Sequence, residues 1–112
     1  MADCVFCTIA KPDQGALHLY QDDDVVGIAD LAPVAPVHIL LIPRVHIVNL
    51  DALTSDRPWN AIRTGAQTLS RQHGWDSTGY RLVINTGTDG GQTVAHLHVH
   101  LLAGRSLQWP PG

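Results

Sequence analysis

Three histidines at alternate positions of one apolar stretch, HLHVHLL over residues 96–102, constrain this chain more than any other feature. Side chains of a β-strand alternate between its two faces. The pattern therefore predicts a strand that turns Leu97, Val99 and Leu101 toward a core and all three histidines toward the opposite face. A polar group buried without a partner costs roughly 2–7 kcal/mol. Three adjacent imidazoles thus indicate a site that uses each ring.

These three rings are too far apart to bind one metal ion together. Along a strand, the Cα atoms of His96 and His100 lie roughly 13 Å apart, whereas Zn–N bonds measure ~2.0 Å. Two neighbouring histidines could chelate, or His96 could bind a metal elsewhere while His98 and His100 face a substrate. The sequence offers further ligands for the second arrangement at Cys4, Cys7 and His46. The CVFC spacing is equally that of a redox pair, so both interpretations stay open here.

The loop NTGTDGGQT, residues 85–93, stands directly before the histidines. Gly90 and Gly91 allow positive φ and a close approach of the backbone to a ligand. Successive amide N–H groups in such a turn form an anion-binding concavity, and Asn85 and Thr93 add an amide and a hydroxyl. Followed by three histidines, the loop reads as a phosphate cradle beside a nucleophile.

Length and charge limit the class of protein. A chain of 112 residues is expected to form one domain, residues 1–112, with a core of its own. The net charge of −3 gives no electrostatic reason to bind nucleic acid. No apolar run approaches the ~20 residues of a membrane span, and the N-terminus shows no signal-peptide pattern. We therefore expect a cytoplasmic protein whose cysteines are thiols or metal ligands rather than a disulfide.

Periodicity and turn signals predict an α+β fold. The clearest helix runs from Asp56 to His73, with Ser55 as its N-cap and Gly74 as its end. Its apolar face comprises Trp59, Ile62, Ala66 and Leu69. A short turn or helix is expected at residues 3–10, and strands at 16–21, 25–30, 37–43, 80–87 and 94–104. Hairpin-length connections favour a mostly antiparallel sheet with the main helix on one face.

Four stretches together resemble the histidine-triad (HIT) superfamily, in its nucleotide-binding (Hint) branch. They are IADLAPVAPVHILLIPRVHI, RLVINTGTDGGQT, GGQTVAHLHVHLLAG and GRSLQWPPG, in this order along the chain. The resemblance implies a HIT-like fold with a five-stranded, mostly antiparallel sheet, one main helix and a short N-terminal helix. It also implies a homodimer in which each C-terminal tail approaches the partner's pocket, although the tail could equally pack onto its own domain.

The resemblance further implies a hydrolase that cleaves the P–N bond of purine nucleoside 5′-phosphoramidates through a nucleotidyl-histidine. His98 would be the nucleophile, with His100, His38 and Thr93 in the catalytic group. An imidazole of ordinary pKa is mostly neutral at pH 7 and carries a free lone pair without an auxiliary base. The nucleotide-binding set would be Asp30, Ile28, Leu31, Leu40, Asn85, Gly91, Thr93, His98, His100 and Trp109.

Zinc-bearing members of the superfamily hold the metal on two cysteines, a histidine after the third strand and the first triad histidine. The resemblance therefore implies structural Zn²⁺ on Cys4, Cys7, His46 and His96. Two departures stand out: Thr93 replaces a common serine, and Gln108 replaces the histidine that often precedes WPPG. Other functions compatible with these residues are a dinucleoside polyphosphate hydrolase, which the WPPG tail disfavours, and a nucleotide-binding regulatory module with little turnover.

Overall fold

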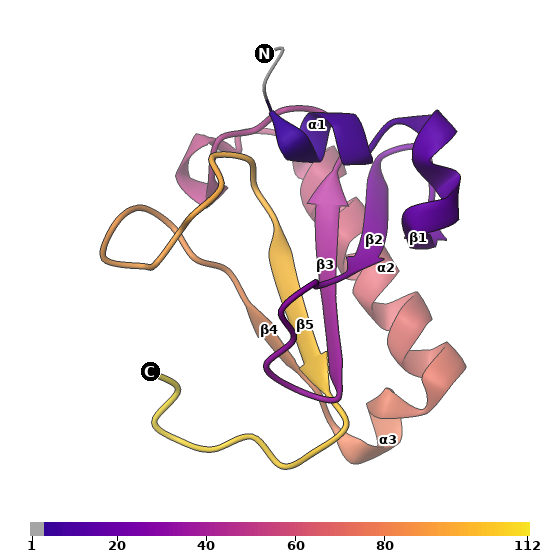
Figure 1. The fold of residues 1–112 in the computed structure, drawn as a ribbon, viewed down its shortest axis with the longest axis vertical. Helices are drawn as coiled ribbons and strands as arrows, with labels where there is room; N and C mark the ends of the chain where they lie inside the picture. Colours follow the sequence, from indigo (N-terminus) through magenta and orange to yellow (C-terminus); the bar gives the residue numbers. More distant parts are fainter. Residues whose placement is uncertain (1–3) are drawn as a thin grey trace.

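The computed structural model describes residues 4–112, which form a five-stranded antiparallel sheet with helices on both faces (Figure 1). The strand order is β1-β2-β3-β5-β4. The strands are β1 (His18–Gln21), β2 (Val25–Ala29), β3 (Val37–Pro43), β4 (Arg81–Val83) and β5 (Val99–Ala103). The helices are α1 (Val5–Ile9), α2 (Asp56–His73) and α3 (Trp75–Thr78), and two 3₁₀ turns, η1 and η2, span Pro12–Leu17 and Leu50–Ala52. This is the predicted α+β, HIT-like architecture.

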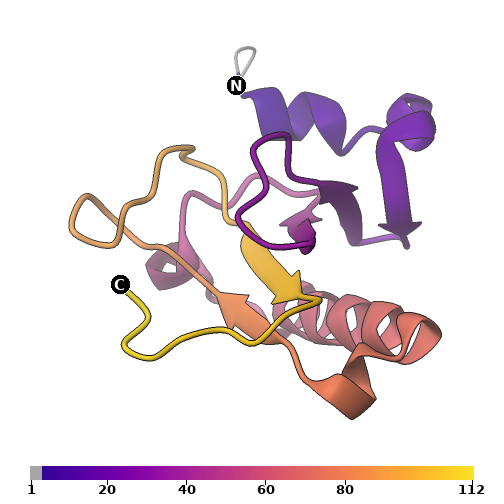
Figure 2. The same cartoon turned by 60° about the horizontal axis from the view of Figure 1, so that its bottom comes forward.

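Alternation along the central strands supplies two apolar layers, one on each face of the sheet. On one face, Leu41, Val99 and Leu101 pack with Ile62 and Leu69 of α2. On the other face, residues of β2 and β3 pack with α1 and the residue that follows it: Phe6, Ala10, Val26, Ile28, Leu40 and Ile42. Figure 2 shows α1 and α2 on opposite sides of the sheet. The second layer matters for function because it lies on the face to which the histidines belong.

The main helix begins and ends where the sequence predicts. The Ser55 side chain accepts a hydrogen bond from the Arg57 N–H, and Gly74 ends the helix with a φ of 78°, a left-handed conformation that glycine adopts without strain. Ile62, Ala66 and Leu69 are buried as expected, whereas Trp59 is 42% exposed. Among the described helices, none combines the length and apolar character that crossing a membrane requires.

Strands β1, β4 and β5 are shorter than the sequence predicts by two residues or more, and β2 is shorter by one. Strand β5 starts at Val99 rather than at residue 94, because its ladder with β3 ends at the Leu41–Val99 pair, although β3 itself continues to Pro43. Residues 94–98 bond instead to the loop after β3, where the Leu97 N–H donates to the Ile47 carbonyl. Strand β1 is shortened by the 3₁₀ turn at Pro12–Leu17, and β4 ends at Val83 before the glycine loop.

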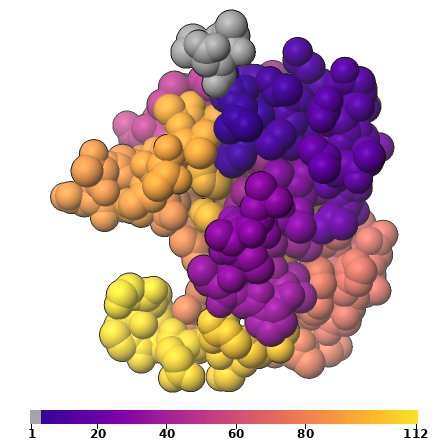
Figure 3. Space-filling view, viewed as in Figure 1, coloured from indigo at the N-terminus to yellow at the C-terminus, as the bar shows by residue number. Residues whose placement is uncertain are grey.

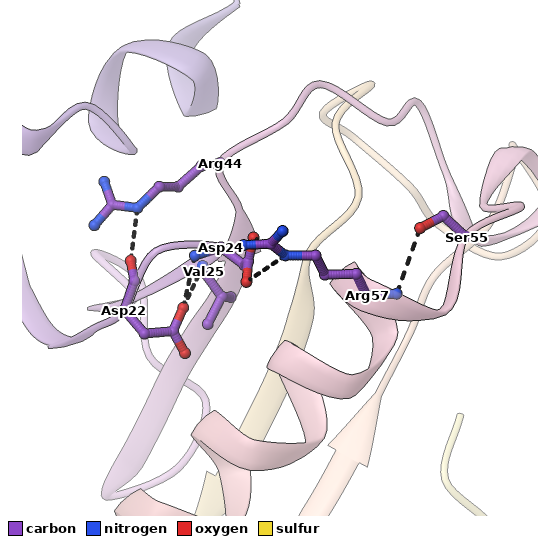
Figure 4. A network of polar contacts seen from close by, with 6 residues as sticks. All are labelled: Asp22, Asp24, Val25, Arg44, Ser55 and Arg57. Atoms are coloured by element: carbon purple, nitrogen blue, oxygen red, sulfur yellow. Dashed lines mark hydrogen bonds and ion pairs between the residues drawn. The ribbon is translucent and has the colours of Figure 1, made fainter.

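Arg44 links the acidic turn between β1 and β2 to the segment that follows α1, and Figure 4 shows its bond to the turn. Asp22 accepts hydrogen bonds from the Asp24 and Val25 N–H groups at 2.8 Å each. Arg44, just after β3, donates to the backbone carbonyls of Asp22 and Ala10. Because Ala10 follows α1, these contacts help to hold α1 over the second apolar layer.

Candidate functional site

Four side chains from distant parts of the sequence form a Cys/His cluster beside α1. Its members are Cys4, Cys7, His46 and His96, whose donor atoms all lie within 4.8 Å of one another. The Sγ atom of Cys4 is 3.3 Å from His96 Nδ1, and the Sγ of Cys7 is 3.2 Å from His46 Nδ1 and 3.5 Å from His96 Nδ1. Tetrahedral zinc with Zn–S of ~2.3 Å and Zn–N of ~2.0 Å places sulfur and nitrogen about 3.5 Å apart. The donor set therefore fits a zinc ion.

His96 is held in the orientation that a metal ligand needs. Its side chain is fully buried, and its Nε2 donates to the Pro43 carbonyl at 2.8 Å. With the proton on Nε2, the lone pair of Nδ1 faces both cysteines. Burial lowers the pKa of His96 below its ordinary value, which keeps the ring neutral and able to bind a metal.

His98 lies next to this cluster and presents a free lone pair in the other direction. Its Nδ1 is 2.8 Å from the His96 carbonyl, and a carbonyl only accepts, so Nδ1 carries the proton. In the neutral ring Nε2 is then unprotonated. The side chain is only 7% exposed, and the Phe6 ring packs against it edge to face, with 5.0 Å between centroids. The arrangement leaves an unprotonated Nε2 on a ring whose orientation is held by a hydrogen bond and by packing.

The protons on His38 and His100 follow from a chain of hydrogen bonds that starts at a backbone amide. The Val34 N–H donates to His38 Nδ1 at 3.1 Å, so a neutral His38 carries its proton on Nε2. This Nε2 lies 2.8 Å from His100 Nδ1, which must accept. His100 consequently carries its own proton on Nε2, where it can donate to a ligand. Burial, followed by the neighbouring His98 and His38, lowers the pKa of His100 and favours this neutral form.

Asp30 completes this second group at the end of β2. Its Oδ2 is 3.3 Å from His38 Nε2, and its Oδ1 accepts from the Ala32 N–H at 2.8 Å. Asp30, His38 and His100 have donor atoms within 4.8 Å of one another. The site therefore contains one carboxylate beside a pair of hydrogen-bonded imidazoles.

The predicted phosphate cradle has a defined backbone, although its Thr93 hydroxyl is not engaged with the histidines. A Cβ on Gly90 would meet the Thr86 carbonyl oxygen at 2.4 Å, so only glycine fits there. Gln92 stabilises the loop by accepting from the Gly87 N–H and donating to the Val48 and Val94 carbonyls. Thr93 is exposed, Asn85 is half-buried, and Gly91 has a φ of 78°. Figure 3 shows a hollow between this loop and the C-terminal tail.

Of the remaining residues predicted to bind the nucleotide, some are buried and others are exposed. Ile28 and Leu40 are buried in the second apolar layer, in the same cluster as Phe6. Leu31 is fully exposed on the loop after β2, and Trp109 is 80% exposed on the tail. The tail is held by a hydrogen bond from Arg81 to the Gln108 carbonyl at 3.0 Å. Trp109 therefore does not pack onto its own domain in this chain.

Sequence reasoning led us to expect a backbone carbonyl on the nucleophilic histidine but did not identify the particular groups that orient the histidines. Three are backbone groups, the carbonyls of Pro43 and His96 and the Val34 amide, which no side-chain pattern reveals. The fourth is Phe6, which packs on both His98 and His96. The position of Phe6 between the two cysteines of CVFC could have indicated this packing. If both cysteines lie at a cluster with His96, a side chain between them lies close to the same histidines.

Comparison with known proteins agrees with this geometry. The chain matches the HIT domain over residues 11–107 and belongs to the HIT domain family. It is 46% identical to an uncharacterised HIT-like protein of Synechococcus elongatus, over 98% of this chain and 97% of the relative. It is 40% identical to a 14 kDa zinc-binding protein of Brassica juncea, over 98% of this chain and 100% of the relative.

A solved structure shares the fold. The crystal structure of a HIT family hydrolase from Legionella pneumophila superposes with a TM-score of 0.88 at 39% identity, covering 98% of this chain and 100% of the other. The fold is thus that of the HIT domain family.

Proposed function

We propose that this protein is a purine nucleoside phosphoramidase of the Hint branch. It would cleave the P–N bond of adenosine or guanosine 5′-phosphoramidates and release the nucleoside monophosphate. The observation that carries the proposal is the hydrogen bond between His98 Nδ1 and the His96 carbonyl at 2.8 Å. Because it leaves Nε2 unprotonated, the ring can attack phosphorus without a separate base.

In the proposed reaction, His98 Nε2 forms a bond to the α-phosphorus while the P–N bond breaks. The departing amine takes up a proton, for which the Nε2 proton of His100 and the Thr93 hydroxyl are the candidate sources. Water then cleaves the nucleotidyl-histidine and restores the free ring. The amides of the loop at residues 85–93 and His100 would stabilise charge on the phosphoryl oxygens.

Nucleotide recognition is proposed for groups on the same face. Asp30 would accept hydrogen bonds from the ribose hydroxyls, since its carboxylate lies at the end of β2 beside His38. Ile28, Leu31 and Leu40 would contact the purine, and the full exposure of Leu31 leaves it free to close on a base. The other residues proposed to contact the nucleotide are Asn85, Gly91 and Trp109.

The reaction is tested with His98→Ala on adenosine 5′-phosphoramidate and on an AMP–lysine conjugate. We expect loss of turnover with an unchanged circular dichroism spectrum. Rapid quench of the wild type should trap the nucleotide on His98. Unchanged turnover in His98→Ala would exclude this function. Faster hydrolysis of diadenosine triphosphate than of the conjugate would indicate a dinucleoside polyphosphate hydrolase, and one equivalent of stable adduct would indicate a regulatory module.

We also propose that the Cys/His cluster binds structural Zn²⁺ through Cys4, Cys7, His46 and His96. The 3.2–3.5 Å sulfur–nitrogen distances support this, as does the relative known as a zinc-binding protein. When bound, zinc would tie α1 to the loop after β3. Chelation should release one zinc per chain and lower the melting temperature. A protein that is fully stable with no metal bound would contradict this assignment.

A homodimer is proposed from the free edge of the sheet. Strand β4 is an edge strand, because it pairs only with β5, and Leu82, Tyr80 and Trp59 beside it are 42%, 37% and 42% exposed. An unpaired edge with apolar neighbours favours association with a second sheet. Solution mass of the wild type and of Leu82→Lys tests this, and truncation after Leu107 tests whether the tail acts on the partner. We also propose a cytoplasmic location, which the sequence predicts.

A further inference from the structure

The segment that carries the two cysteines also carries an aromatic ring that touches the nucleophile. Phe6 lies between Cys4 and Cys7 and is 8% exposed. Its ring packs edge to face on His98, with 5.0 Å between centroids and 79° between planes, and on His96 at 6.0 Å and 78°. The turn that presents Phe6 is fixed by sulfur, since Cys4 Sγ accepts from the Cys7 N–H at 3.3 Å.

A second connection runs through His96 itself. Its ring faces Cys4 and Cys7 through Nδ1, and its carbonyl accepts the Nδ1 proton of His98 at 2.8 Å. The next residue, Leu97, donates its N–H to the Ile47 carbonyl at 2.6 Å, directly after His46. A shift of the cluster would therefore move the carbonyl that orients His98.

The two connections constrain different motions of the nucleophile. The carbonyl determines which nitrogen of His98 carries the proton, whereas the Phe6 ring limits how far the imidazole can swing. Helix α1 has only five residues and is too short to be stable by itself. The position of Phe6 thus depends on its packing and on the two cysteines that flank it.

We propose that Phe6 is a positioning residue, and that it and the His96 carbonyl couple occupancy of the Cys/His cluster to the placement of His98. Zinc bound to the cluster would restrict the motion of the CVFC turn and of His96. His98 Nε2 would then be held in an orientation that faces the substrate phosphorus. The proposal rests on the proposed function for the role of His98. It adds that the metal controls the rate of the chemical step as well as the stability of the fold.

The coupling predicts a response of His98 that does not depend on turnover. The ring-nitrogen signals of His98 are compared by NMR in the wild type with zinc bound and after the metal has been removed. We expect them to shift or broaden on metal removal, although His98 is not a ligand. In Phe6→Leu the response should shrink by at least about half, while Val5→Ala, on the exposed side of the same turn, should keep it. Identical His98 signals with and without zinc would overturn the coupling.

Steady-state kinetics distinguish a role of Phe6 in positioning His98 from a direct contact between Phe6 and the purine. In zinc-loaded protein, Phe6→Leu should lower kcat about tenfold while KM changes less than about twofold, because misplacement acts on the reacting geometry. A mainly raised KM would instead make Phe6 a contact of the purine and overturn its positioning role. Removing zinc from the wild type should lower kcat similarly, and the two perturbations should be strongly non-additive. Effects that multiply independently would refute the coupling.

The outcomes also separate this inference from the proposed function. If zinc-loaded wild type hydrolyses no phosphoramidate, the proposed function fails, and the His98 signals still decide the coupling. If the wild type hydrolyses the substrate but its His98 signals ignore zinc, the coupling alone fails. Should Phe6→Leu not fold, Phe6→Met replaces it, and the wild-type comparison needs no substitution.

Discussion

Replacing His38 by phenylalanine tests whether a backbone amide determines the protonation pattern of the site. The ring of His38 is buried, accepts from the Val34 N–H at 3.1 Å and contacts His100 Nδ1 through Nε2 at 2.8 Å. His38→Phe keeps an aromatic ring but removes both bonds, together with the 3.3 Å contact between His38 Nε2 and Asp30 Oδ2. Val34 is exposed, so water can accept the hydrogen bond that its N–H donated to His38. His100 Nδ1, by contrast, loses a donor in a buried position. Such a loss costs about 1–3 kcal/mol.

At about 1.36 kcal/mol per factor of ten, this loss corresponds to a 5- to 150-fold lower kcat/KM. The measurement is steady-state hydrolysis of adenosine 5′-phosphoramidate, with circular dichroism and melting temperature to verify folding. His38→Gln should recover part of the activity, since its Nε2–H can donate to His100. His73→Phe, on the exposed end of α2, is the matched control. Activity of His38→Phe within twofold of the wild type would refute the reasoning.

Three further predictions follow from packing and charge. Leu97→Ala should lower the free energy of unfolding by about 2–5 kcal/mol in chemical denaturation, because Leu97 is 1% exposed in the core. Gly90→Ala should weaken AMP binding at least about tenfold in calorimetry, since its Cβ would meet the Thr86 oxygen at 2.4 Å and displace the loop. The pKa of His100 is lowered from 6.5 by burial, so the unfolded chain binds its proton first on acidification. Stability from this group is complete above pH 6.5 and is lost as the pH falls through and below it. Melting curves should show that dependence, and His100→Gln should reduce it.

The elements with strong local signals were predictable, and those that depend on a neighbouring strand were not. Helix α2 has an N-cap at Ser55 and a left-handed glycine at its end, so residues next to the helix determine both of its bounds. Strand β3 coincides with its apolar run. The start of β5 is different, because the alternating pattern continues through residues 94–98 although the ladder with β3 stops at the Leu41–Val99 pair. The length of a strand is set by pairing, which the pattern of a single segment does not contain.

The candidate site divides along the same line. The histidine pattern, the CVFC spacing and the resemblance to the HIT superfamily together indicated the side chains that the fold assembles into the cluster. The face opposite Leu97, Val99 and Leu101 was correctly assigned to the histidines. That His96 is fully buried under α1 could not be read from the alternation, because it depends on where Phe6 packs. The groups that orient the histidines could not be identified from the sequence either. Every residue has a backbone carbonyl, and only the folded structure shows that those of Pro43 and His96 accept from the rings.

The hydrogen bonds also indicate how ligand binding would act on the proton chain. The Nε2 proton of His38 faces two acceptors, His100 Nδ1 at 2.8 Å and Asp30 Oδ2 at 3.3 Å. If Asp30 binds ribose hydroxyls as proposed, the carboxylate gains competing donors and its hold on this proton weakens. The proton then belongs more fully to the bond with His100, which strengthens the arrangement that leaves a donor on His100 Nε2. Asp30→Asn, which turns an acceptor into a group that can also donate, should therefore lower kcat as well as raise KM, and an effect on KM alone would limit Asp30 to binding.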